Sequence, residues 1–230
     1  MKSVVLLSSG LDSTVNLFEA HQKTEIVLVL TFNYGQRAVL KEIDRAQKLC
    51  KLSKLKHQVI DITWFSGVGK SSLIDKSKTV PTGQSVSIDN FKVSTETASS
   101  VWVPNRNGVF LNIAAAFAES LNAEVVIPGF NQEEATTFPD NSLAFMKALD
   151  NSFEYSTANK VKISCYTVNL SKPEIVEKAK SLNIPLEYIW PCYFADNQWC
   201  GQCESCQRSK RAFEAQGLDF TQFAIKSSRI

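Results

Sequence analysis

A polar turn that reads Ser8-Ser9-Gly10-Leu11-Asp12-Ser13 separates the apolar run 3–7 from a helical pattern over 12–21. Such a run predicts a strand buried in a parallel sheet. The start of the following helix offers unpaired N–H groups and partial positive charge, which bind phosphate without a lysine. The Ser8 and Ser13 hydroxyls add donors, and Gly10 lets the backbone approach a ligand. We predict a phosphate loop from Ser8 to Thr14; the alternative is a plain corner in which Ser or Asp caps the helix.

The alternation of strand and helix patterns continues along the chain. Further strand patterns lie at 26–32, 56–62, 124–128 and 163–168, and helical patterns lie at 37–52, 108–121, 139–155 and 173–182. This order predicts an α/β fold over residues 1–188, with a parallel twisted sheet and helices on both faces. Sheets of this kind bind ligands beyond the carboxyl ends of their strands. The turn after the first strand therefore lies where a ligand is expected.

Segment 64–101 differs from the rest because it is rich in Ser, Thr, Lys and Gly and shows little periodicity. A connection of this length is usually functional or mobile. We predict that it forms a long loop that acts as a lid over bound nucleotide, which would then protect it from proteases.

Composition restricts the class of function. The 230 residues are 44% apolar and 21% charged, as in a globular protein with a sizeable core. A net charge of +2 is small for a dedicated nucleic-acid binder and favours small-molecule chemistry. The N-terminal apolar run is too short for a signal peptide, and no stretch approaches the ~20 apolar residues of a membrane helix. We therefore expect a cytoplasmic protein that does not enter a membrane.

Four of the six cysteines share the spacing C-x7-C-x2-C-x2-C near the C-terminus: Cys192, Cys200, Cys203 and Cys206. Four thiolates at this spacing can close a tetrahedral zinc site, and a reducing compartment favours metal over disulfides. We predict one structural zinc ion in residues 189–230, a small C-terminal metal-binding segment with its tail. An iron–sulfur cluster is the alternative. Cys50 and Cys165 fall in helix and strand patterns and are expected to be buried apolar residues.

The phosphate turn is similar to the fingerprint Ser-Gly-Gly-x-Asp-Ser of the PP-loop ATP pyrophosphatases, with four of its five fixed positions matched. Ser9 replaces a glycine; if that position requires positive φ, serine costs about 1 kcal/mol. Together with the cysteines, the whole chain resembles the family of 7-cyano-7-deazaguanine synthases. Further segments that carry the resemblance lie at 33–37, 103–107, 138–140 and 191–193.

The chain departs from that family's pattern on the expected substrate side. The family usually has Asp where Asn33 stands, Gly where Asn105 stands and Asp near Glu133. It usually has Tyr-Pro-Asp-Cys-Arg where residues 138–142 include Asn141 and Ser142. A related acid as substrate therefore stays open.

The resemblance implies a reaction in the queuosine precursor pathway. 7-Carboxy-7-deazaguanine and ammonia would give 7-cyano-7-deazaguanine, driven by ATP through an adenylated carboxylate and an amide, with two ATP equivalents. Mg²⁺ would offset the phosphate charge. The family also implies a homodimer.

Several polar residues become candidates through this resemblance. Arg37 and Arg106 are expected to bind phosphate or carboxylate bidentately, and Lys172 matches a family lysine. Glu133, its neighbour Glu134, and Asp140 are candidates for accepting hydrogen bonds from a guanine-like edge. The alternatives are solvated surface positions for the cations and helix capping for Asp140. Aromatic candidates for stacking on the base are Phe32, Tyr34 and Phe138.

Two other functions stay open. One is a different PP-loop adenylating enzyme, such as a tRNA thiolase or a lysidine-forming ligase, which should carry a larger basic surface and bind tRNA with steep salt dependence. The other is a non-catalytic zinc-ribbon interaction protein, for which residues 8–13 would be only a turn. Pyrophosphate release from ATP in the presence of a deazaguanine acid separates it from the enzymes.

Overall fold

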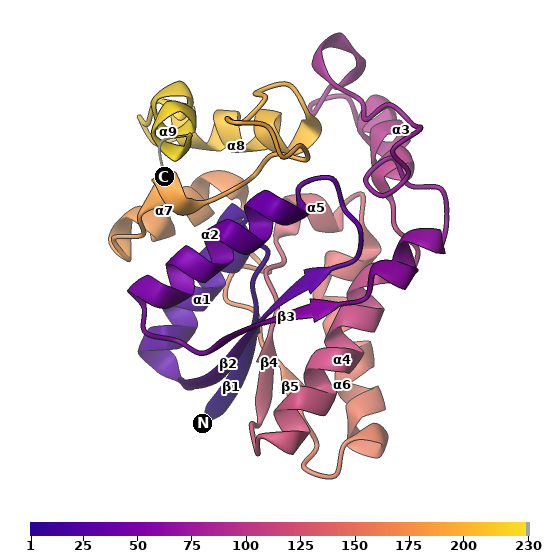
Figure 1. Cartoon of the computed structure of the whole chain (residues 1–230), viewed down its shortest axis with the longest axis vertical. Helices are drawn as coiled ribbons and strands as arrows, with labels where there is room; N and C mark the ends of the chain where they lie inside the picture. Colours follow the sequence, from indigo (N-terminus) through magenta and orange to yellow (C-terminus); the bar gives the residue numbers. More distant parts are fainter. Residues whose placement is uncertain (229–230) are drawn as a thin grey trace.

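Five apolar runs form one parallel sheet in the computed structural model, which describes residues 1–228 (Figure 1). The strands are β1 (Lys2–Leu6), β2 (Glu25–Asn33), β3 (His57–Asp61), β4 (Val125–Ile127) and β5 (Lys162–Ile163). Their order across the sheet is β3-β2-β1-β4-β5, and all neighbouring pairs are parallel. The chain runs from β1 to one edge and then crosses to β4 on the other side of β1. This reversal is the switch point at which such sheets bind ligands.

The predicted alternation of helices with strands is confirmed. The helices are α1 (Leu11–Lys23), α2 (Val39–Leu52), α3 (Phe91–Val101), α4 (Arg106–Ser120), α5 (Gln132–Ala135), α6 (Leu143–Ser156), α7 (Lys172–Ser181), α8 (Glu204–Ala215) and α9 (Phe220–Ser227). Short 3-10 helices lie at Thr63–Gly67, Gly83–Ser85, Pro139–Asn141 and Leu186–Tyr188. None of the helices in residues 1–228 combines the length and apolar character that a bilayer crossing requires.

Alternate side chains of the strands pack against two helical layers. Val4 and Val126 point to the face that α4 and α6 cover, whereas Val5 and Val29 point to the face covered by α1 and α2 (Figure 1). A third apolar cluster joins the start of α1 to α7, α8 and α9, so residues 189–228 share a core with the α/β fold. The predicted helices on both faces are confirmed.

Three local predictions were wrong. The last strand ends at Ile163 rather than 168, because β4 offers only three residues and the chain then turns to donate Tyr166 N–H to Asn16 Oδ1 at 2.7 Å. The helix expected from residue 139 begins at Leu143, where the Ser142 hydroxyl caps it by accepting from Phe145 N–H at 3.1 Å.

The third difference lies in segment 64–101, which is not irregular throughout. It ends in α3, whose first turn is capped by Asn90 Oδ1 accepting from Val93 N–H at 3.2 Å. Figure 1 shows α3 beside the start of α8, far from it in the sequence.

Candidate active site

A cavity of about 250 Å³ lies at the switch point of the sheet. Its walls include the carboxyl ends of β1 and β2, the residues after β4, and side chains from α2, α4, α7 and α8. The segment 190–193, which leads into the cysteine cluster, forms part of the wall. The sheet topology and the cavity thus agree on one place for a ligand.

The predicted phosphate loop, between β1 and α1, lines this cavity. The Ser8 and Ser13 hydroxyls lie 3.2 Å apart, and Gly10 N–H donates to Ser8 Oγ at 3.4 Å. Because α1 begins at Leu11, its first N–H groups have no partner within the helix and can take phosphate oxygens. Ser8 and residues 10–13 line the cavity, whereas Ser9 and Thr14 are fully buried behind them.

Ser9 has the left-handed conformation that the family's glycine would adopt freely, with φ at +58°. Its hydroxyl donates to the carbonyls of Ser8 at 2.6 Å and Glu42 at 3.2 Å. Its own carbonyl accepts from Trp190 N–H at 2.7 Å. These hydrogen bonds offset a backbone cost of about 1 kcal/mol and turn the side chain away from the cavity, so the serine does not block the loop.

Gly129, which the sequence analysis missed, allows the loop to sit against β4. A Cβ at this position would lie 2.5 Å from the backbone N and Cα of Ser13. No side chain fits there, because the obstructing atoms belong to a helix backbone. The available signal was a glycine directly after a buried parallel strand.

Replacing Gly129 with alanine is expected to push the start of α1 out of place. We expect a loss of about 1–3 kcal/mol in the free energy of unfolding, as for overpacked sites, and at least tenfold weaker ATP binding by about the same energetic scale. Calorimetric ATP titration and denaturant unfolding measure both. Gly67→Ala is the matched control, since a Cβ there meets nothing within 4 Å. Equal ATP affinity in both variants would contradict the assigned close approach.

Lys172 joins two carboxylates in the cavity wall. Its Nζ lies 2.5 Å from Asp12 Oδ2 and 2.8 Å from Glu134 Oε1, and its side chain is 5% exposed. Burial alone lowers the pKa of Lys172, but the charges of Asp12 and Glu134 outweigh this and raise that pKa above its ordinary value. Lys172 is therefore a permanent cation next to the phosphate loop.

The two carboxylate oxygens of Asp12 differ in their contacts. Asp12 Oδ2 also accepts from Asn131 at 3.3 Å, but Oδ1 is buried without a hydrogen-bond partner among the described residues. Burial raises the pKa of Asp12, and attraction to Lys172 offsets only part of this. Two carboxylates share one ammonium group here, so an additional cation would be favourable. The unpartnered oxygen fits a hard, oxygen-binding divalent ion.

Arg106 is the cavity-lining cation with the least internal engagement. Lys172 and Arg208 form ion pairs, and Arg37 donates to backbone carbonyls. Arg106 instead donates to Tyr34 Oη at 3.3 Å and lies over the Tyr34 ring, with no ion pair among the residues described. Its guanidinium group is thus available to an anion in the cavity, as its prediction as a phosphate or carboxylate ligand requires.

Other predicted site residues have partners away from the cavity. Arg37 lines it, but its guanidinium donates to the carbonyls of residues 72, 75 and 78 and so fastens segment 64–101. The Glu133 carboxylate accepts from Lys172 N–H at 2.9 Å and Arg211 at 2.6 Å, which ties α5 to α7 and α8. Asp140 is not in the lining, and burial raises its pKa although nearby Arg106 opposes this. The adjacent Glu134 and Asn141 line the cavity instead.

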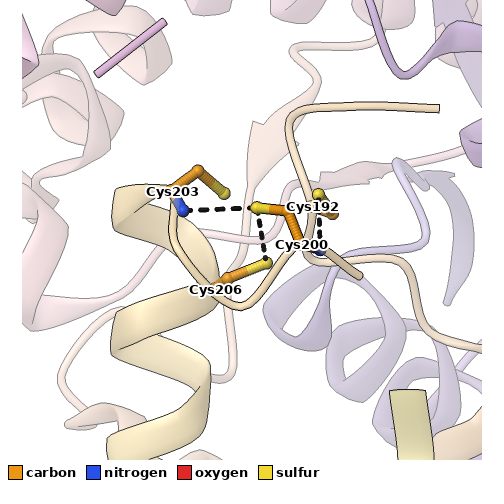
Figure 2. Close-up of side chains that lie close together, drawn as sticks. All are labelled: Cys192, Cys200, Cys203 and Cys206. Carbon is orange, nitrogen blue, oxygen red and sulfur yellow. Dashed lines mark hydrogen bonds between the residues drawn. The ribbon is translucent and has the colours of Figure 1, made fainter. Parts of the chain in front are cut away.

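The four predicted cysteine ligands converge beside the cavity (Figure 2). Their sulfur atoms all lie within 4.8 Å of one another. Cys203 is the N-cap residue of α8 and Cys206 lies in its first turn, whereas Cys192 and Cys200 belong to the loop before the helix. Hydrogen bonding within the cluster, first of all with Cys192, lowers the pKa of Cys200 and raises the pKa of Cys206. Four thiols this close cannot all ionise without a cation between them, so the cluster could hold a metal ion.

Backbone amides complete the environment of the sulfur atoms. Cys203 N–H donates to Cys200 Sγ at 3.3 Å, and Phe194 N–H donates to Cys192 Sγ at 3.4 Å. Donors of this kind stabilise thiolate ligands and fix their orientation. Cys165 lies outside the cluster, accepts from Phe130 N–H at 3.4 Å, and is partly buried rather than fully buried. Cys50 is buried, as predicted.

The cluster connects the cavity to segment 64–101. Cys203 and Thr82 form an isolated antiparallel β-bridge, and Gly83 N–H donates to Gln202 O at 3.0 Å. Further along α8, Glu204 accepts from the Thr97 hydroxyl of α3 at 3.0 Å. The long segment therefore rests on α8 at several points.

Comparisons with known proteins bear on the classification of the chain. The profile of the family described as "Queuosine biosynthesis protein QueC" matches residues 2–217. The chain is 57% identical to a 7-cyano-7-deazaguanine synthase of Bdellovibrio bacteriovorus, over 95% of each chain. It is 47% identical to one of Desulforamulus reducens, over 96% of this chain and 97% of the other.

Among solved structures, the chain is similar to the U34-tRNA thiolase NcsA from Methanococcus maripaludis, with a TM-score of 0.51 and 14% identity, over all of this chain and 70% of the other. This likeness concerns the fold. The profile match over nearly the whole chain and the identities near one half decide the classification. The chain belongs to the QueC family.

Proposed function

We propose that this chain is an ATP-dependent C–N ligase that converts 7-carboxy-7-deazaguanine and ammonia to 7-cyano-7-deazaguanine in queuosine precursor biosynthesis. The names of its relatives give the product, 7-cyano-7-deazaguanine. The proposal rests chiefly on the phosphate loop, which lines the cavity with Ser9 turned aside, and on Asp12 in the same lining, whose buried Oδ1 has no hydrogen-bond partner among the described residues. The nucleotide domain would be residues 1–188 and the metal-binding segment residues 189–230.

The chemistry accounts for the groups in the cavity. A carboxylate oxygen is a poor leaving group, so its attack on the α-phosphorus of ATP, with release of pyrophosphate, creates a better one. Ammonia then displaces AMP to give an amide. Removing the amide oxygen requires a second activation, hence two ATP equivalents. Adenylation needs no protein nucleophile; it needs phosphate binding, charge balance and orientation.

Residues of the chain have distinct roles in this proposal. The loop from Ser8 to Thr14 holds the pyrophosphate portion of ATP through backbone N–H groups and hydroxyls. Lys172 neutralises phosphate charge, and Asp12 Oδ1 would coordinate Mg²⁺, which when bound offsets phosphate charge. Arg106 binds the carboxylate of the acid and holds it toward the α-phosphate.

The aromatic residues suit a flat heterocycle. Phe32, Tyr34 and Phe138 line the cavity, as does Phe110, which the sequence analysis did not single out. Phe32 and Phe110 stack on each other with centroids 4.1 Å apart. Such rings form a wall against which a deazaguanine can stack.

Most departures from the family pattern lie outside the cavity lining, which supports the family's own substrate. The Asn33 side-chain amide donates a hydrogen bond to Asp61 Oδ2 at 2.9 Å. Asn105 has a positive φ of 52°, a conformation that glycine adopts without strain. Asn tolerates this conformation better than most residues. Of the predicted departures, Phe138, which stands where the family has Tyr, and Asn141 line the cavity and are placed to alter substrate contacts.

For the metal we propose one structural Zn²⁺ per chain. Four protein thiolates leave no open coordination position, which is typical of structural zinc and leaves none for catalysis. A colourless protein with one zinc per chain would separate this from an iron–sulfur cluster, which absorbs visible light. A homodimer and a cytoplasmic location remain part of the proposal.

The experiment is incubation of the purified chain with ATP, ammonium and 7-carboxy-7-deazaguanine, followed by mass spectrometry. We expect the nitrile, with the amide as an intermediate, and two AMP and two pyrophosphate per nitrile. ATP bound without turnover would instead favour the interaction-module alternative. Salt-sensitive tRNA binding with a modified tRNA product would favour the thiolase alternative, which the small net charge of +2 disfavours.

A further inference from the structure

Four carboxylates line the cavity, and three of them are in ion pairs. Asp12 and Glu134 share Lys172, and Glu204 pairs with Arg208 at 2.8 Å. Glu42, in the first turn of α2, has no ion pair among the described residues. Its Oε2 accepts a hydrogen bond from Gln36 Nε2 at 2.7 Å. Glu42 is therefore a cavity carboxylate held by an amide and without its own cation.

Gln36 is fixed as a donor to Glu42. Its Oε1 accepts from Tyr34 N–H at 3.0 Å, which determines the orientation of the amide, and its Nε2 also donates to Phe32 O at 2.9 Å. Gln36 is only 4% exposed. Three hydrogen bonds thus hold the Gln36 side chain at the end of β2, and the one to Oε2 positions the Glu42 carboxylate.

Glu42 lies between the two ends of the cavity. The Ser9 hydroxyl donates to its backbone carbonyl at 3.2 Å, which places the first turn of α2 against the phosphate loop. Arg106 is near enough to lower the pKa of Glu42, but burial, the dominant cause, raises that pKa to about 7. The carboxyl group can therefore gain or lose a proton near neutral pH, beside the place where the acid must meet the α-phosphate.

We propose that Glu42 binds ammonium in the cavity and accepts the proton whose loss makes it ammonia. The inference rests on the proposed function, which requires a nitrogen nucleophile but assigns no residue to it. An ammonium ion is the small cation that this unpaired carboxylate lacks. Once bound, it lies between the phosphate loop and Arg106, where the activated carbon of the acid would be.

The Glu42 carboxylate takes one proton from NH₄⁺, which leaves neutral NH₃ with a free electron pair. That pair forms the C–N bond at the acyl carbon, and the C–O bond to AMP breaks with its electrons on AMP. The nitrogen loses one further proton to the departing phosphate or to water, giving the amide. Glu42 then returns its proton to solvent before the next ammonium ion binds.

Glu42→Gln tests this with little change in shape, because the new amide oxygen can still accept from Gln36. Two nucleophiles are compared at neutral pH: ammonium, which must lose a proton, and hydroxylamine, which is largely uncharged. We expect kcat/KM for ammonium to fall about 100-fold, while hydroxamate formation from the same acid changes by less than about 3-fold. The KM for the acid should stay near the wild-type value. Glu177→Gln, on the exposed face of α7, is the matched control.

Each outcome decides a different question. Equal losses with ammonium and hydroxylamine, or a raised KM for the acid, would overturn the inference and place Glu42 against the guanine-like edge instead. Unchanged kinetics with ammonium would also overturn it. A wild-type chain that forms neither amide nor hydroxamate would overturn the proposed function itself, whereas a wild type active with both nucleophiles leaves only the role of Glu42 at issue.

Discussion

Replacing Cys203 with serine is expected to abolish metal binding and to destabilise the part of the cavity wall that the C-terminal segment contributes. Cys203 is fully buried, is the N-cap residue of α8, and forms an isolated β-bridge with Thr82. Loss of a structural metal belongs to the few changes that cost about 4 kcal/mol or more. We expect the metal content to fall from one per chain to near zero, with a large drop in melting temperature.

The same substitution should also weaken ATP binding, although among the described residues no cysteine sulfur is hydrogen-bonded to the phosphate loop. The reason is that Trp190, which lies two residues before Cys192, donates its backbone N–H to Ser9 O at 2.7 Å. Cys50→Ala is the control, because Cys50 is buried outside the cluster. Elemental analysis, thermal unfolding and ATP titration measure the three effects. A Cys203→Ser protein with full ATP affinity would show that the metal centre and the loop are independent.

Replacing Lys172 with methionine is expected to leave two buried carboxylates without their cation. Removing one partner of a buried ion pair costs about 3–5 kcal/mol, because the remaining charge is uncompensated. Met is similar in length and apolar, so packing changes little. Denaturant unfolding should show this loss, and adenylation should fall below detection because the ammonium group next to the phosphates is gone.

Lys180→Met on the same helix is the matched control. Lys180 is exposed and donates to Gln216 O at 3.2 Å, so its loss should change stability by less than about 1 kcal/mol. If Lys172→Met were as stable as this control, the Asp12–Lys172–Glu134 cluster would not be an ionised group in the native protein.

The sequence predicts the phosphate loop because its signals are local. An apolar run, a small polar turn and a helix start within a dozen residues fix both the strand and the exposed N–H groups. The four cysteines are equally local, within residues 192–206. For such sites the chain needs few distant contacts to bring the ligands together.

The remaining residues of the site depend on long-range packing that spacing does not encode. Arg37 was predicted as an anion ligand, and its Nε and one terminal nitrogen donate to three carbonyls of segment 64–101, contacts that spacing does not reveal. Glu42 lies on α2 in an ordinary amphipathic pattern, and only the fold places it beside Ser9. Gly129 matters because β4 lies next to β1, which is a consequence of the crossover.

In the proposed reaction, the cavity at the switch point adenylates a carboxylate. Incubation with the acid labelled by ¹⁸O in both carboxylate oxygens tests it, with mass spectrometry of the nucleotide products. We predict that each AMP formed carries one ¹⁸O, transferred when the C–O bond breaks. Unlabelled AMP, or label found in inorganic phosphate together with ADP, would contradict adenylation and with it the role assigned to the phosphate loop.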